Sequence, residues 1–141
     1  MGLIAEARKG GSAESTRGHL VEAGLSERII GCCIKVHRTL GPGFLEKIYE
    51  EALAMELTKA GLAHERQKPI VITYDGKVIG EHRLDLIVEG RVILELKAAK
   101  AIEDIHLATA RSYLKATDLI LALVINFAKP TLEIKRVVQS F

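Results

Sequence analysis

The most informative stretch of the chain reads Arg83-Leu-Asp-Leu-Ile-Val-Glu-Gly-Arg-Val-Ile-Leu-Glu-Leu-Lys97. Successive side chains of a strand point to opposite faces of a sheet, so the period-two pattern predicts two strands joined by a turn at Glu89-Gly90. The even positions are all aliphatic: Leu84, Leu86, Val88, Val92, Leu94 and Leu96. The odd positions carry Arg83, Asp85, Ile87, Ile93, Glu95 and Lys97. We therefore expect one face to be pure core and the other to hold two carboxylates and an ammonium group.

The length of the loop between these strands decides whether the two carboxylates meet. Asp85 and Glu95 share a face if the strands pair through a three-residue loop, residues 89–91, or an equivalent bulge. A two-residue turn would place Asp85 opposite Leu94. Gly90 suits the positive φ of the longer loop, so we expect the carboxylates to lie together.

Two carboxylates on neighbouring strands, with Lys97 two residues beyond the second, suit a divalent metal site for phosphodiester hydrolysis. Oxygen ligands favour Mg²⁺ or Mn²⁺, and such an ion polarises phosphoryl oxygens. The alternative is a solvated face with a surface pair between Glu95 and Lys97. Burying charge in so apolar a stretch needs a compensating reason, which favours the site.

The rest of the chain alternates between helical and strand periods. We expect a first helix capped by Ser26 and stopped by Gly41-Pro42-Gly43, a second over residues 44–60 and a third over 103–116. The buried stripe of the second helix is predicted to be Leu45, Ile48, Tyr49, Ala52, Leu53 and Leu57.

Strands are predicted over residues 69–74, 78–88, 92–97, 119–126 and 132–138, with Asp75-Gly76 as a hairpin turn. The order α-α-β-β-β-α-β-β predicts an α/β sandwich of one mixed sheet and helices.

Composition points to one soluble globular domain. The chain has 141 residues, of which 48% are hydrophobic and 27% charged, which excludes disorder throughout, collagen and coiled coil. The formal net charge is +2, so any affinity for nucleic acid must come from a local patch. Residues 1–22 are rich in Gly, Ser and Ala and are expected to form a flexible tail before a domain at 23–141.

The cysteines and the hydropathy bear on the compartment. Cys32 and Cys33 are adjacent and make no disulfide framework, so a reducing, cytoplasmic setting is expected. No apolar run reaches the ~18 residues of a membrane span, so no membrane association is predicted. The five histidines show no paired metal spacing, and we assign no zinc.

Two motifs resemble those of a known family. Asp85, nine residues and then Glu95-Leu96-Lys97 resemble the signature of the PD-(D/E)XK nuclease superfamily. Upstream, Gly43, Glu46 and Tyr49 match the Gly-x-x-Glu-x-x-Tyr signature of its small GxxExxY proteins. The resemblance covers about residues 25–139 and implies a restriction-endonuclease-like α/β sandwich, with a central mixed sheet flanked by helices.

The resemblance also implies roles for individual residues. Asp85 and Glu95 become metal ligands, joined by the main-chain carbonyl of Leu96, and Lys97 becomes the catalytic lysine. Glu46 occupies the place of the acidic residue on the helix before the sheet; the alternative is a favourable charge in the first turn of a helix. The residues expected to support the site are Tyr49, Arg83, His106 and Tyr113. Tyr49 is expected in the core, with its hydroxyl reaching the edge of the site.

The activity implied is Mg²⁺- or Mn²⁺-dependent hydrolysis of DNA phosphodiester bonds. The alternative is a catalytically degenerate nuclease fold that serves as a nucleic-acid-binding or protein-interaction module, and a third is a purely structural subunit. Many superfamily members carry a Gln four residues before a Tyr on the helix after the lysine; counting back from Tyr113 gives Thr109. Related nuclease cores often act as dimers, so by analogy this chain could form a homodimer.

Overall fold

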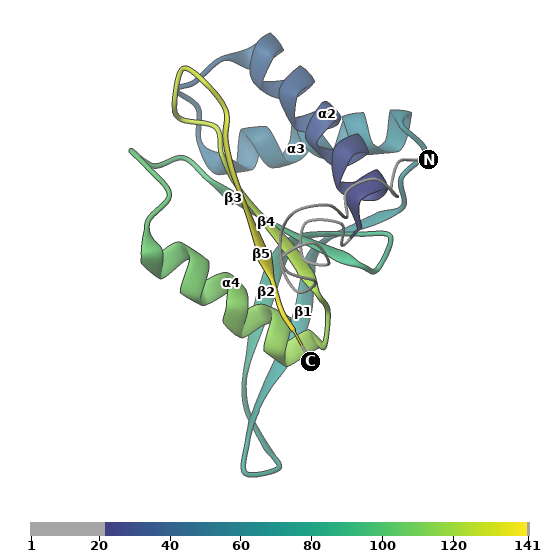
Figure 1. Ribbon diagram of the computed structural model, residues 1–141, viewed down its shortest axis with the longest axis vertical. Helices are drawn as coiled ribbons and strands as arrows, with labels where there is room; N and C mark the ends of the chain where they lie inside the picture. The colour runs from purple at the N-terminus through teal and green to yellow at the C-terminus, as the bar shows by residue number, and fades with distance from the viewer. Residues whose placement is uncertain (1–21, 141) are drawn as a thin grey trace, which may run out of the picture.

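A computed structural model describes residues 22–140, so nearly all of the predicted tail at 1–22 lies outside the described residues. The described elements follow the predicted order (Figure 1). The helices are α2 (Ala23–Leu40), α3 (Glu46–Lys59) and α4 (Asp104–Thr117). The strands are β1 (His64–Tyr74), β2 (Lys77–Val88), β3 (Val92–Lys97), β4 (Leu121–Asn126) and β5 (Glu133–Val138).

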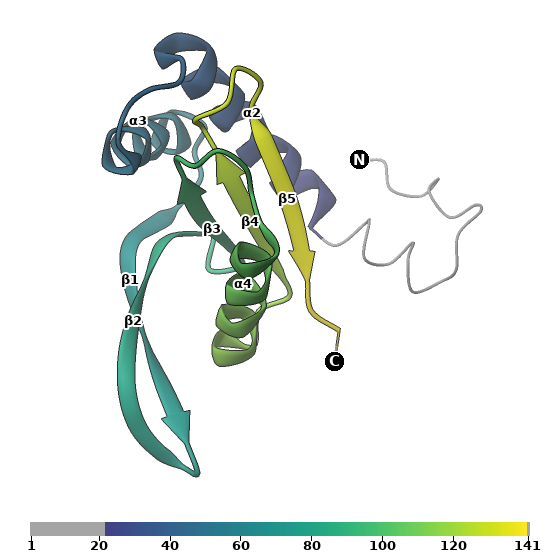
Figure 2. The ribbon, with the colours of Figure 1, turned by 90° about the vertical axis from the view of Figure 1, so that its left-hand side faces the viewer.

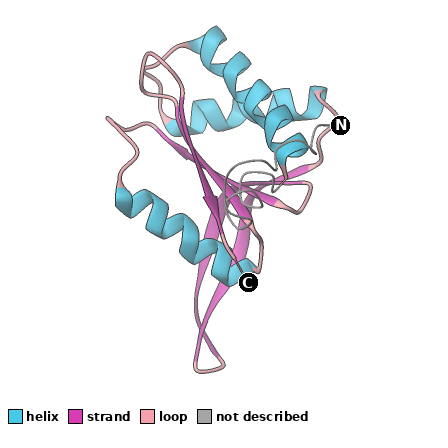
Figure 3. Cartoon of the chain, viewed as in Figure 1, coloured by secondary structure: helices cyan, strands magenta, loops and turns pink. Residues whose placement is uncertain are grey.

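The strands form one five-stranded sheet in the order β1-β2-β3-β4-β5. Among the strands in residues 22–140, only β3 and β4 pair in parallel. The chain reaches β4 from β3 through α4, because parallel neighbours need a crossover connection. The sheet is mixed, as predicted. Helices α2 and α3 lie together on one face and α4 lies on the other (Figures 2 and 3).

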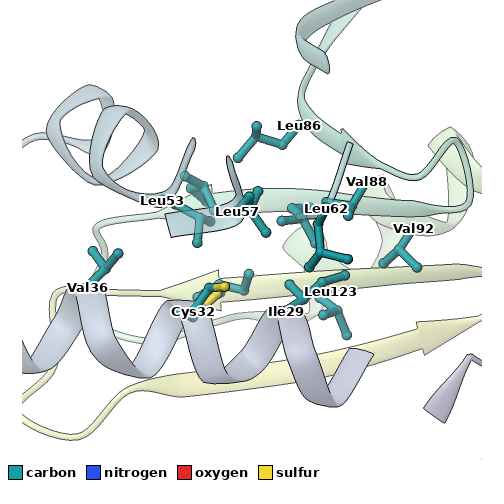
Figure 4. Close-up of a cluster of buried hydrophobic side chains, with 14 of the residues drawn as sticks. Ile29, Cys32, Val36, Leu53, Leu57, Leu62, Leu86, Val88, Val92 and Leu123 are labelled. Carbon is teal, nitrogen blue, oxygen red and sulfur yellow. The ribbon is translucent and has the colours of Figure 1, made fainter. Parts of the chain in front are cut away.

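The sheet buries apolar side chains on both faces. Between the sheet and the helices α2 and α3, a large cluster gathers side chains from all three (Figure 4), among them Ile29, Leu53, Leu57, Leu94 and Leu123. Beneath α4, a second cluster contains Leu84, Ile93, Ala110, Leu114 and Val124. Burial on both sides explains why β4 is a continuous apolar run.

Both predicted hairpin turns are confirmed. Val88 pairs with Val92 and Leu86 with Leu94, which leaves the three-residue loop 89–91, and Gly90 has a φ of 65°. The Asp75-Gly76 turn joins the paired ends of β1 and β2, with φ values of 55° and 75°.

The face assignment of β2 is wrong at one position. Leu84 packs in the cluster beneath α4 together with Ile93, whereas Leu86 belongs to the other cluster. Between the pairs Arg66–Leu86 and Lys68–Leu84, Gln67 has a φ of +52°. A left-handed residue interrupts the regular alternation of a strand. The pairing of β1 with β2 is irregular beside Gln67, and Leu84 and Leu86 of β2 therefore face opposite sides of the sheet.

Strand β1 begins five residues before its predicted start at Pro69. Its first half, His64 to Lys68, is polar because β1 is an edge strand, where apolar alternation is not required.

The predicted cap of the first helix is also wrong. Helix α2 begins at Ala23, so Ser26 is buried inside it and its hydroxyl donates to the carbonyl of Ala23 at 3.2 Å. The predicted end is confirmed, because Gly41 adopts a φ of 73° and its N–H donates to the carbonyl of His37.

The buried stripe of α3 is narrower than predicted. Tyr49, Leu53 and Leu57 are fully buried, but Leu45 is 78% exposed and Ile48 46%. Tyr49, Leu53 and Leu57 follow one another at intervals of four and line up on the side that faces the sheet. Leu45 and Ile48 lie further round the helix.

Tyr49 fastens the loop that leads into α3. Its hydroxyl donates to the carbonyl of Gly41 at 2.6 Å and accepts from the N–H of Phe44 at 3.2 Å. Its ring stacks on Phe127, with centroids 4.6 Å apart and planes 10° from parallel. The side chain is therefore a core residue whose polar end holds the entry to the helix.

We predict that Tyr49→Phe lowers the free energy of unfolding by about 1–3 kcal/mol, because the ring can still stack while the Gly41 carbonyl loses a buried donor. Urea denaturation measures the change. Tyr74→Phe is the matched control, since Tyr74 is 71% exposed and its substitution should leave stability unchanged. Equal stability of the two variants would show that the hydroxyl of Tyr49 does not hold the loop.

Candidate active site

Asp85 and Glu95 lie side by side where β2 and β3 run next to each other. The N–H of Asp85 donates to Glu95 Oε2 at 3.4 Å, and the N–H of Leu96 donates to Asp85 Oδ2 at 2.8 Å. These reciprocal contacts follow from the three-residue loop, which puts positions 85 and 95 at one level. The expected pair of carboxylates is therefore present on neighbouring strands.

Both carboxyl groups hold their protons more tightly than free side chains do. Burial, followed by the negative charge of Asp85, raises the pKa of Glu95 to about 8. Burial also raises the pKa of Asp85, and the charges of Glu50 and Glu46 act in the same direction. The N–H of Leu96 and the ammonium of Lys97 oppose these effects at Asp85. When both groups are ionised, the pair carries more negative charge than its protein surroundings neutralise.

Helix α3 brings two further carboxylates to the pair. Glu46, in its first turn, accepts a hydrogen bond from the N–H of Ala98 at 3.3 Å, so it reaches the chain just after Lys97. Glu50 lies one turn further on and is buried. Its carboxylate accepts from Gln67 Nε2 at 2.9 Å and from Arg66 Nε at 3.0 Å.

The main chain after Lys97 is held by Asn126, which pairs with Lys97 across β3 and β4. The fully buried Asn126 accepts from the N–H of Ala99 at 3.1 Å and donates to the Ala99 carbonyl at 2.8 Å. It also donates to Glu133 Oε1 at 3.1 Å. The N–H of Phe127 donates to the carbonyl of Lys97 at 3.0 Å. The side chain of Lys97 therefore projects from a main chain that these hydrogen bonds hold in place.

Of the four expected supporting residues, Tyr113 is the one whose pKa responds to the charges of the two carboxylates. Burial and the charges of Glu95 and Asp85 raise its pKa to about 12, so the phenol is neutral. Its ring stacks on His82, with centroids 4.3 Å apart. Thr109 lies one turn before Tyr113 on α4 and is half-buried.

The other three supporting residues make contacts outside the carboxylate pair. Arg83 donates to the carbonyl of Gln67 at 3.0 Å and links β2 to β1. His106 accepts from the N–H of Glu103 at 2.9 Å in the capping box of α4. The hydroxyl of Tyr49 bonds to the loop before α3, as described above.

Three residues that surround the carboxylates, Glu50, Gln67 and Asn126, were given no role from the sequence. Glu50 carried a signal, since it follows Glu46 by one helical turn. Asn126 ends the apolar run of β4, where a buried amide needs partners. The left-handed backbone of Gln67 gave no signal, because positive φ is rare outside glycine and asparagine.

The donor set suits a hard divalent cation. Among the described residues, the buried Glu95 carboxylate accepts only the 3.4 Å hydrogen bond from Asp85, and oxygen atoms of both acids remain for other partners. A cation would offset the excess negative charge. No group of three or more His, Cys, Asp or Glu side chains in residues 22–140 could hold a metal ion. Further oxygens would have to come from main chain, solvent or substrate, as is common for Mg²⁺.

The cysteines take no part in this site. Both are free and buried in α2, and burial raises the pKa of each thiol. Neither is therefore an activated nucleophile.

The order of elements, the mixed sheet and the helices on both faces define a restriction-endonuclease-like α/β fold. Residues 23–137 match the family model of the PD-(D/E)XK nuclease superfamily, and the chain belongs to that superfamily.

The structure is also similar to the crystal structure of SSO0001, with a TM-score of 0.54 and 17% sequence identity. The match covers 89% of this chain but only 62% of that one, and at this identity the likeness concerns the fold alone. No curated protein has a significantly similar sequence. None of the described helices combines the length and hydropathy needed to cross a lipid bilayer.

We predict that stability without metal decreases as pH rises from about 5 to 8. The folded chain keeps a proton on Glu95 up to a pKa of about 8, whereas the unfolded chain loses it near the ordinary value of 4.5. The stabilisation is complete below the unfolded pKa and is lost as pH rises through the folded one, at no more than about 1.4 kcal/mol per pH unit from this group.

Urea denaturation in EDTA across this pH range measures the effect. Glu95→Gln should flatten the decline, while Glu81→Gln, an exposed carboxyl of the β1–β2 hairpin, should retain it. A decline as steep in Glu95→Gln as in the wild type would assign the titration to another group.

Proposed function

We propose that this chain is a metal-dependent nuclease of the GxxExxY type that hydrolyses DNA phosphodiester bonds. The observation that carries the proposal is the meeting of Asp85 and Glu95 on neighbouring strands, with the charges of Lys97 and Glu46 close by. An excess of carboxylates beside one lysine is costly for folding and is useful for binding a cation.

Asp85, Glu95 and the carbonyl of Leu96 would hold Mg²⁺ or Mn²⁺. When bound, the ion would offset negative charge that builds on the phosphate during hydrolysis. The buried position of Glu95 excludes water from one side of the pair, which strengthens the electrostatic contacts made there.

Lys97 would orient the attacking water and place positive charge beside the reacting phosphate. The charge of its half-buried side chain partly opposes the rise in the pKa of both acids, so its ammonium lies within electrostatic reach of each. The hydrogen bonds to its carbonyl and to Ala98 and Ala99 fix the main chain from which it projects. A charged group that is held in a fixed position can lower the activation barrier, which increases the rate of the reaction.

Glu46 on α3 and Tyr113 on α4 would border the reacting phosphate from two different helices. Glu46 holds the N–H of Ala98 and adds to the local negative charge. The neutral phenol of Tyr113 can donate a hydrogen bond to a phosphate oxygen. Exposed Lys100, Arg111 and Lys115 supply the local cations that a nearly neutral chain needs for DNA.

One observation favours a second candidate function. Thr109 stands where many superfamily members carry the Gln that helps to orient the site, and its shorter side chain supplies no amide. The alternative is therefore a degenerate site on a module that binds nucleic acid without cutting it.

Incubation with plasmid and oligonucleotide DNA in Mg²⁺ or Mn²⁺ tests the activity. We predict that Asp85→Asn and Lys97→Ala each lower the cleavage rate at least about 100-fold, because each removes a charge from the reacting centre. Lys77→Ala, at the exposed tip of the hairpin, should cleave like the wild type. Undiminished cleavage by the first two variants would reveal a contaminant.

A direct measurement of Mn²⁺ binding separates the two candidates. Isothermal titration should show a site in the wild type that Asp85→Asn and Glu95→Gln abolish, since each replaces a charged ligand by a neutral amide. Binding of DNA and Mn²⁺ without cleavage would establish the degenerate module. Failure to bind nucleic acid at low salt would point instead to a structural role.

A further inference from the structure

Two aromatic side chains form a stacked pair beside the carboxylates. His82 of β2 stacks on Tyr113 of α4, with ring centroids 4.3 Å apart and planes 20° from parallel. Burial and the charges of Glu95 and Asp85 raise the pKa of Tyr113, so the pair lies within electrostatic reach of the candidate site. His82 is three residues from Asp85 on the same strand, which is about 10 Å along it. The stacked pair is therefore a close neighbour of the two acids.

The face of β2 that carries His82 changes from core to open surface within a few residues. Leu84 is buried beneath α4, His82 is half-buried, and Gly80 is exposed. These three positions alternate along β2 and its pairing with β1 is regular between them, so they share one face. Figure 2 shows the hairpin of β1 and β2 continuing past α4 and beyond the rest of the sheet. The surface next to the His82 ring therefore belongs to Gly80.

Gly80 leaves an open place beside this ring. Apart from its chain neighbours, no atom of the described residues lies within 4 Å of where a Cβ would be. The φ of Gly80 lies outside the left-handed region, so the backbone does not demand glycine there. Glycine weakens a strand interior and often marks a close approach by a ligand. Half-buried Ile72 pairs with Gly80 across the hairpin, and we call His82, Gly80 and Ile72 the stacking shelf.

We propose that the stacking shelf binds one unpaired base of the DNA strand whose phosphate reaches Asp85 and Glu95. The inference rests on the proposed function for the phosphate and adds a site for the base. An aromatic ring offers a surface on which the flat face of a base stacks, and every base has such a face. Tyr113 already holds the His82 ring in place, so binding costs little side-chain freedom.

The stacking shelf also selects a class of substrate. In a duplex, neighbouring base pairs cover both faces of each base, which must be unpaired and unstacked before a side chain can stack on it. Single strands and frayed ends expose these faces at little cost. The formal net charge of +2 gives only weak general attraction to phosphates, so stacking supplies affinity that charge does not. The substrate is therefore single-stranded or frayed DNA.

Fluorescence anisotropy with Ca²⁺ in place of Mn²⁺ compares two single strands, one with bases and one made of abasic sugar-phosphate units. The full-length wild type should bind the strand with bases at least about fivefold more tightly. His82→Ala removes the ring and Gly80→Val fills the open place, so both variants should bind the two strands almost equally. His82→Trp should keep the preference, because it keeps an aromatic surface.

Tyr74→Ala is the matched control, since Tyr74 is an aromatic residue of the same hairpin that is 71% exposed. It should keep the preference of the wild type for bases. Circular dichroism checks that each variant is folded. Equal affinity of the wild type for the two strands overturns the proposal, as does a preference that His82→Ala leaves unchanged. These measurements need no cleavage, so a chain that prefers bases but never cuts DNA contradicts the nuclease and retains the stacking shelf.

Cleavage in Mn²⁺ tests the class of substrate. The wild type should cut single-stranded DNA at least about tenfold faster than a duplex of the same sequence. His82→Ala should reduce this preference mainly by raising KM for the single strand, because stacking holds the substrate and does not act on the reacting phosphate. Faster cleavage of the intact duplex by the wild type overturns this assignment of the substrate.

Discussion

The register between β2 and β3 is the constraint on which the site depends. The three-residue loop sets Asp85 level with Glu95 and lets each strand donate one N–H to the carboxylate of the other. A slip of one residue would turn one carboxylate to the opposite face and set apolar side chains in its place. The buried residues on both faces of the sheet hold this register, because any slip would expose them.

In the same arrangement, ionisation of the two carboxyl groups costs free energy. Burial and mutual repulsion raise the pKa of both carboxyl groups, and Glu46 and Glu50 add further negative charge. The chain tolerates this cost because Arg66, Gln67 and several backbone N–H groups bind parts of the cluster. These groups do not neutralise all of the negative charge of the carboxylates, and a cation would offset the remainder. Any affinity of this site for a cation would therefore be opposed to the stability of the protein without one.

Helix α3 connects the fold and the site. Its inner side fills the core, its first turn delivers Glu46 to Ala98, and Tyr49 fixes the loop through which it is entered. The motif Gly43, Glu46 and Tyr49 thus has a physical basis. Gly43 adopts a φ of 113°, Tyr49 binds the main chain of the loop before the helix, and Glu46 binds the N–H of Ala98 after β3.

The sequence by itself determined the order of elements, both hairpin turns and the meeting of Asp85 with Glu95. These features depend on short-range periodicity and on turn residues, which neighbouring positions encode. Tertiary structure decided which apolar side of α3 is buried, which face Leu84 takes, and that Glu50, Gln67 and Asn126 join the surroundings of the site. Those outcomes depend on which elements pack together across long separations in the chain, and local patterns carry no record of that packing.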